Sequence, residues 1–192
     1  MTGEEAGAAP GTAPADGCLS LVIVMGGAGP GRAAAHAADW LARRACLHGG
    51  FDVNVIDLAY AQLPPARPGR TEPRPAAVRE LEPWLAEADA YVVVVARDAR
   101  DAADGLRDAA EWYRAHWRSR PVGFITYETA GEPRPPDRLR QTFAAAGATV
   151  LRTVAACPGG LGLPCDALAA DLLDELAARA RGSGPARAPH TG

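Results

Sequence analysis

The chain has 192 residues, of which 22% are charged, and a formal net charge of −3. This length fits one domain with tails, and the mixed signs of charge argue against a nucleic-acid-binding surface. All 20 basic residues are arginine, which excludes a Schiff-base lysine, a pyridoxal-phosphate attachment and a Walker A lysine.

The two ends of the chain are predicted to be disordered. Residues 1–17 are rich in Gly, Ala and Pro and lack the basic and apolar regions of a secretory signal. Residues 182–192 have a similar composition, which leaves one domain over residues 18–181. No apolar run approaches the roughly 18 residues of a membrane span. We therefore expect a cytoplasmic protein without a membrane contact.

The four cysteines have neither the spacing of a metal site nor that of a redox pair. They are Cys18, Cys46, Cys157 and Cys165. In a reducing cytoplasm the simplest interpretation is four free thiols and no bound metal.

The first half of the chain alternates strand and helix patterns. A continuous apolar run predicts a buried strand over Leu19–Met25. A helix is predicted over Arg32–His48, where Gly49 and Gly50 stop it. Alternating apolar residues predict a second strand over Phe51–Asp57. Five prolines then predict a loop over residues 62–75.

The second half continues the alternation. The most apolar stretch, Ala90–Val95, is expected to be the central strand. Two charged loops are predicted, over Ala96–Asp104 and over Glu128–Pro136. The remaining predicted elements are helix Ala76–Ala88, helix Gly105–Trp117, strand Pro121–Tyr127, helix Asp137–Ala146, strand Ala148–Ala155 and helix Cys165–Ala180.

This order of elements predicts the α/β fold class: a flavodoxin-like, doubly wound, five-stranded parallel sheet with helices on both faces. Ligands of such sheets bind beyond the carboxyl ends of the strands. Three predicted loops converge at that edge: Gly26–Arg32, Ala96–Asp104 and Glu128–Pro136.

The first loop has the composition of an anion site. Glycines turn the chain tightly and expose backbone N–H groups, and the following helix adds a partial positive charge. Its candidate cofactor-binding residues are Gly26, Gly27, Gly29, Gly31 and Arg32. Because the loop has no Ser, Thr or Lys, only Arg32 can meet a phosphate with a side chain.

Residues 19–180 resemble the NAD(P)H-dependent FMN reductase family, which is flavodoxin-like and includes quinone and azo-dye reductases. Pro30-Gly31-Arg32 is similar to the family's first loop, and Asp57-Leu58 with Leu63-Pro64 to the end of its second strand. Tyr91 to Val95 resembles the strand before the flavin loop. Arg120 to Tyr127 resembles the fourth strand. The resemblance implies FMN as cofactor, NADPH as its reductant and a homodimer.

The three loops differ from the family pattern. The usual Gly-Ser-x-Arg of the first loop is replaced by Gly26-Gly27-Ala28-Gly29, and the usual Pro-Glu-Tyr-Asn of the second by Ala96-Arg97-Asp98-Ala99. The third loop begins Glu128-Thr129-Ala130-Gly131 in place of a Gly-Gly cradle. The side chains that would hold a flavin are therefore replaced, whereas the intervening strands and helices keep the family pattern.

The replaced loops contain the candidate catalytic residues Glu128, Asp98 and Arg97. They are interpreted either as an acid–base and anion-binding cluster or as a solvated charged turn. Glu128 is the sharper candidate, because burial at a pocket rim raises a carboxyl pKa. His36 is either a surface histidine or a general base, and Cys157 either a structural thiol or a residue of the pocket rim.

Three functions remain open. The first is a flavin-independent enzyme that performs acid–base chemistry on a small molecule in the former flavin crevice. The second is an NAD(P)H-dependent FMN or quinone oxidoreductase with an atypical phosphate loop. The third is a non-catalytic partner of a flavin enzyme. The fold alone does not choose among them.

Overall fold

The fold is built on a parallel five-stranded sheet with the strand order β2-β1-β3-β4-β5. The computed structural model describes residues 17–26, 33–66, 74–96, 100–127, 137–156 and 163–183. The strands are β1 (Leu19–Met25), β2 (Phe51–Asp57), β3 (Ala90–Ala96), β4 (Pro121–Tyr127) and β5 (Thr149–Ala156). This order and direction confirm the flavodoxin-like prediction.

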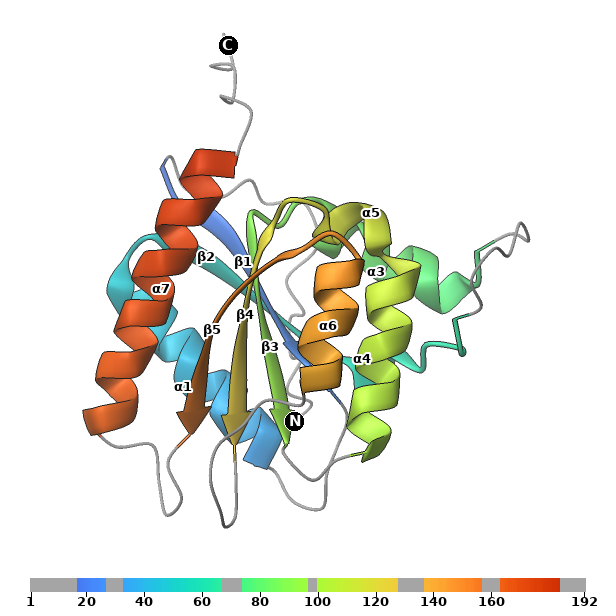
Figure 1. The fold of residues 1–192 in the computed structure, drawn as a ribbon, viewed down its shortest axis with the longest axis horizontal. Helices are drawn as coiled ribbons and strands as arrows, with labels where there is room; N and C mark the ends of the chain where they lie inside the picture. The colour runs from blue at the N-terminus through green and yellow to red at the C-terminus, as the bar shows by residue number, and fades with distance from the viewer. Residues whose placement is uncertain are drawn as a thin grey trace, which may run out of the picture.

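Helices cover both faces of the sheet (Figure 1). α1 and α7 pack on one face, and α3, α4, α5 and α6 on the other. Their bounds are α1 (Ala33–His48), α2 (Leu58–Ala61), α3 (Ala76–Ala86), α4 (Arg100–Trp112), α5 (Arg114–Trp117), α6 (Asp137–Ala145) and α7 (Leu163–Ser183). The sheet is thus enclosed on both sides, which explains why its central strands are apolar on both faces.

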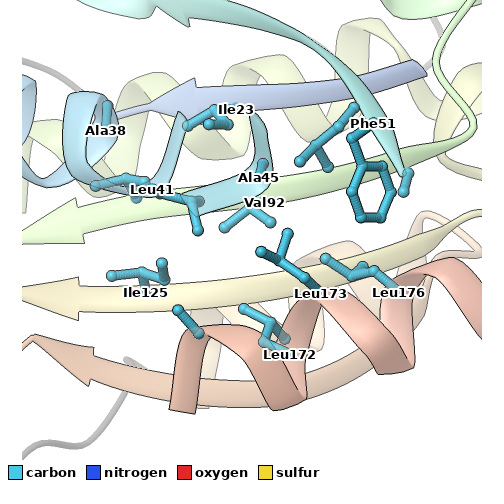
Figure 2. Close-up of a cluster of buried hydrophobic side chains, with 14 of the residues drawn as sticks. Ile23, Ala38, Leu41, Ala45, Phe51, Val92, Ile125, Leu172, Leu173 and Leu176 are labelled. Atoms are coloured by element: carbon cyan, nitrogen blue, oxygen red, sulfur yellow. The ribbon is translucent and has the colours of Figure 1, made fainter. Parts of the chain in front are cut away.

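The core between the sheet and the α1–α7 pair is aliphatic. Figure 2 shows Leu41 and Ala45 of α1 gathered with Leu173 of α7 around Val92 of the sheet, with Ile23 beside the α1 residues. All five are no more than 1% exposed. Leu172, Leu173 and Leu176 thus form the inward face of α7.

The core on the other face is aromatic. Trp117 packs edge-on against Tyr91 with a ring-centroid distance of 4.3 Å and against Phe143 at 5.1 Å. Phe143 in turn packs against Phe124 at 5.6 Å. The Tyr113 hydroxyl, also buried, donates to the Val78 carbonyl at 2.9 Å. These contacts hold α3, α5 and α6 against the central strands.

Two predictions about the segment 96–117 are wrong. The structure has helix from Arg100, where a polar loop was predicted to run to Asp104, because a charge-rich stretch can still form an exposed helical turn. The single helix predicted over Gly105–Trp117 is broken into α4 and α5. The break is at Tyr113, whose φ of −108° and ψ of 26° leave the helical region.

The prediction of four free thiols is wrong for Cys165. This residue is buried in α7 and is disulfide-bonded, whereas Cys18 and Cys46 are free. Pairing depends on which segments the fold brings within bonding distance, which spacing along the chain does not give. Cys157 lies outside the described residues.

Candidate functional site

The candidate crevice lies beyond the carboxyl ends of β1, β3 and β4. These strands end at Met25, Ala96 and Tyr127, and Figure 1 shows their arrowheads at one edge of the sheet. β1 and β3 are neighbours in the sheet. The chain continues from β1 to β2 and from β3 to β4, and these two strands lie on opposite sides of the pair. Such a switch point is where open parallel sheets bind ligands.

Most of the predicted site residues lie outside the described part of the chain, and their roles stay predictions. They are Gly27, Gly29, Gly31, Arg32, Arg97, Asp98 and Glu128. What the structure defines is the base of the crevice, at the strand ends from which the three loops depart.

Gly26 is the one predicted cofactor-binding residue that the structure describes. It is buried, and its backbone N–H donates to the Val94 carbonyl at 3.1 Å. This bond extends the pairing of β1 and β3 by one residue. The Gly26 amide is therefore engaged in the sheet, and free amides for an anion must come from the residues that follow it.

Thr126 is a polar residue at this edge that sequence reasoning missed. It pairs in register with Val95 of β3 and is 0% exposed. Its hydroxyl has no hydrogen-bond partner among the described residues. Leaving a buried hydroxyl unpaired costs about 1–3 kcal/mol. A bound ligand or a water molecule that satisfies this hydroxyl would recover that energy.

His36, the candidate general base, is exposed on α1. This placement agrees with the interpretation of His36 as a surface histidine. Among the described residues, no group of three or more His, Cys, Asp or Glu side chains could hold a metal ion.

A second concave site lies at the outer edge of the sheet, along β2. It is a pocket of about 450 Å³ between β2, α2 and α3. We call it the edge pocket, and its main lining residues are Asn54, Ile56, Asp57, Tyr60, Leu81 and Trp84. It adjoins the crevice, because Asp57 at the end of β2 pairs in register with Met25 at the end of β1.

Asp57 connects β2 to the short helix α2. Its Oδ1 accepts the Ala59 amide at 2.9 Å and so caps the helix. Sequence reasoning did not predict this helix, although an aspartate at the end of a strand is a typical cap signal.

The polar cluster at the amino edge of the sheet is structural. The Asp89 Oδ2 accepts the Ser20 amide at 3.0 Å, and Arg120 lies 3.5 Å from the Asp89 Oδ1. The Tyr91 hydroxyl donates to the Leu85 carbonyl at 2.5 Å. Burial raises the pKa of Tyr91 far above its ordinary value, so this phenol stays protonated.

The sequence of the chain matches one family model over residues 19–160, that of NADPH-dependent FMN reductases. The chain belongs to this family. The match covers most of the chain and runs through all three loops of the crevice, and the family is one of oxidoreductases. No curated protein matches the chain.

Solved structures of other proteins share the fold of this FMN reductase family member. An oxidoreductase from Corynebacterium diphtheriae is 15% identical, with a TM-score of 0.67, over 88% of this chain and 100% of that one. The NAD(P)H:acceptor oxidoreductase FerB from Paracoccus denitrificans is 12% identical, with a TM-score of 0.61, over 87% and 100%. An archaeal flavodoxin is 14% identical, with a TM-score of 0.55, over 85% and 99%.

The first loop of this family member has few side chains that can bind a phosphate. The stretch from Gly26 to Arg32 offers one cationic side chain and no hydroxyl to the flavin phosphate, and the Gly26 amide is already bonded to Val94. A charge-assisted hydrogen bond to phosphate contributes about 1.5–3 kcal/mol. Arg32 is therefore the one side chain of this stretch that can make such a bond.

Proposed function

We propose that this FMN reductase family member is a small-molecule enzyme that works without bound flavin. Its reaction is acid–base chemistry on a small substrate in the crevice that flavin occupies in the family. Glu128 exchanges a proton with the substrate. Arg97 and Asp98 bind its polar groups.

The observation that carries the proposal is the contrast between the scaffold and the loops. The five strands keep the parallel order of the flavodoxin-like fold, whereas the loops beyond their carboxyl ends lack the family's flavin-binding side chains. The unpaired hydroxyl of Thr126 at the same edge supports a bound polar ligand, because an occupant would satisfy it.

In the proposed reaction, a carboxylate at position 128 accepts a proton from the substrate. The Arg97 guanidinium stabilises the negative charge that this transfer leaves on the substrate, since a fixed cation in a crevice is already oriented toward the developing charge. The proton returns to the product from the same carboxyl group.

Flavin retention is the first test. The purified protein is incubated with excess FMN, desalted and examined by visible spectroscopy, with the Paracoccus FerB flavoenzyme as a positive control. We expect no flavin absorption band from this chain and no FMN-dependent oxidation of NADPH. A retained band would refute the flavin-independent mechanism.

Catalysis is tested by a screen of carbonyl and carboxylate compounds with the flavin-free protein. For a substrate found in this way, Glu128→Gln is expected to lower kcat by about 10²-fold or more. Glu80→Gln is the matched control, because Glu80 is exposed on α3. Equal activity of the two variants would exclude Glu128 as the acid–base group.

The second candidate is an NAD(P)H-dependent FMN or quinone oxidoreductase with an atypical phosphate loop. Membership of the FMN reductase family favours it, and Arg32 together with the loop amides would then hold the phosphate. A stoichiometric flavin band that Arg32→Ala removes would support this function over the first.

A further inference from the structure

The edge pocket is where apolar and aromatic side chains remain uncovered. Three large hydrophobic residues are markedly exposed in the described part of the chain: Leu47, Val55 and Tyr60. Two of them, Val55 at 43% and Tyr60 at 88% exposed, line this one pocket. Its volume of about 450 Å³ is in the range of small-molecule sites. Exposed apolar surface gathered in a concavity is typical of binding sites.

Trp84 differs from the other three tryptophans in its indole N–H. The indole N–H groups of Trp40, Trp112 and Trp117 donate to Asp166, to the Pro64 carbonyl and to the Ala109 carbonyl.

Trp84 lies on α3 with its side chain half-buried against the core, and its indole N–H has no hydrogen-bond partner among the described residues. This N–H is not among the buried polar atoms without a partner, so solvent reaches it. Trp84 lines the edge pocket, so a ligand there can replace water as the acceptor.

The negative charge of Asp57 favours a cationic ligand in the edge pocket. Among the described residues that line the pocket, Asp57 is the single charged one. The Asp57 Oδ1 accepts the Ala59 amide. Its Oδ2 has no partner among the described residues, and so it can accept a hydrogen bond from a bound cation.

The aromatic rings of Trp84 and Tyr60 also favour a cationic ligand. The faces of Trp84 and Tyr60 attract a cation through their quadrupoles, and their flat surfaces stack on a planar ring. An apolar wall formed by Ile56 and Leu81 removes water from the body of such a ligand. A carboxylate, two aromatic rings and an apolar wall are together complementary to an organic cation with an aromatic body.

We propose that the edge pocket binds a small planar aromatic cation, with the cationic group on Asp57 and the ring between Tyr60 and Trp84. The pocket adjoins the crevice at the end of β1, but none of its described lining residues takes part in the chemistry proposed there. It gives this chain a second ligand site on the outer edge of its sheet.

The probe for the test is p-aminobenzamidine, whose fluorescence increases when its ring enters an apolar site. Its matched control is p-aminobenzoate, which has the same ring and the opposite charge. We expect saturable binding of the amidine to the full chain and at least about tenfold weaker binding of the benzoate, because a charge-assisted hydrogen bond is lost and repulsion is added.

The variants locate the site. Asp57→Asn keeps the helix cap, since asparagine caps as well as aspartate, but removes the charge. It is expected to weaken amidine binding about tenfold. Trp84→Phe is expected to weaken it about threefold through the lost indole. Asp52→Asn, on the same strand but outside the pocket lining, is the control and leaves binding unchanged.

Three results would overturn the proposal. The first is equal affinity for the amidine and the benzoate. The second is amidine binding that Asp57→Asn and Asp52→Asn affect equally. The third is a dimer in sedimentation velocity that Tyr60→Ser dissociates while the amidine fails to bind, which would assign the pocket to a second copy of the chain. Circular dichroism of each variant separates loss of binding from loss of fold.

Discussion

Replacing Thr126 with valine is expected to stabilise the ligand-free protein. The threonine is 0% exposed, and its hydroxyl is unpaired among the described residues. Valine has nearly the same shape and carries a methyl group in place of the hydroxyl. The substitution therefore removes an unpaired polar group without opening a cavity beside Val95, its neighbour in register.

Two contributions, both stabilising, set the expected gain in the free energy of unfolding. An unpaired buried hydroxyl costs about 1–3 kcal/mol, and a buried methyl group contributes about 0.8 kcal/mol. Taking the low end of the first term, because a transient water can serve the hydroxyl, the net gain is about 1–2 kcal/mol. For a domain of this size, that gain raises Tm by about 2–8 °C.

The assay is thermal unfolding of the ligand-free protein, followed by circular dichroism. Thr142→Val is the control, because the Thr142 hydroxyl does have a partner, the Arg138 carbonyl at 2.8 Å. Thr142→Val should not raise Tm. If Thr126→Val unfolds at a lower temperature than the wild type, the Thr126 hydroxyl is paired in solution and the reasoning is refuted. A crevice ligand that bonds to Thr126 would stabilise the wild type more than the variant.

Two further predictions concern packing and charge. Gly123→Ala would place a Cβ 2.9 Å from Leu172 Cδ1, and we expect it to lower the free energy of unfolding in urea by about 1–3 kcal/mol. Gly105→Ala is the control on α4: its Cβ meets nothing within 4 Å, and it should raise the free energy of unfolding by about 0.5–1 kcal/mol. An equal loss of stability in both variants would contradict the clash at Gly123. The hydrogen bond from Arg74 lowers the pKa of Glu82 below its ordinary 4.5. The ionised Glu82 side chain therefore stabilises the folded protein above pH 4.5, and this stabilisation is lost as the pH falls through the lowered pKa. Unfolding free energies of wild type and Glu82→Gln should therefore differ at pH 7 and converge in acid, and a difference that persists at low pH would argue against this origin.

Sequence patterns predicted the strands because each strand has a continuous or alternating apolar pattern of its own. The bounds of β1, β2 and β4 match the prediction to the residue, since Gly, Pro and charged residues mark their ends. The break at Tyr113 and the short helix α2 were missed. The break at Tyr113 depends on contacts between segments distant in sequence, such as the bond from Tyr113 to Val78. The helix α2 is a single turn held by a local cap.

The candidate sites also differ in whether the sequence alone indicates them. A glycine-rich loop after a buried strand indicates an anion site from sequence alone, because its chemistry lies in consecutive residues. Thr126 has no such signal, since its unpaired hydroxyl depends on what surrounds it in space. The edge pocket had none either, because it gathers residues from β2, α2 and α3.

The sequence by itself determined the fold class, the family resemblance and the loops that depart from the family's motifs, because each of these is encoded in neighbouring residues. The tertiary structure decided which polar groups are left without partners. The Gly26 amide is bonded to Val94 and the Asp57 Oδ1 to Ala59, while the buried Thr126 hydroxyl has no partner among the described residues. Hydrogen bonding is satisfied in three dimensions, so only the packed chain shows where a ligand has something to complete.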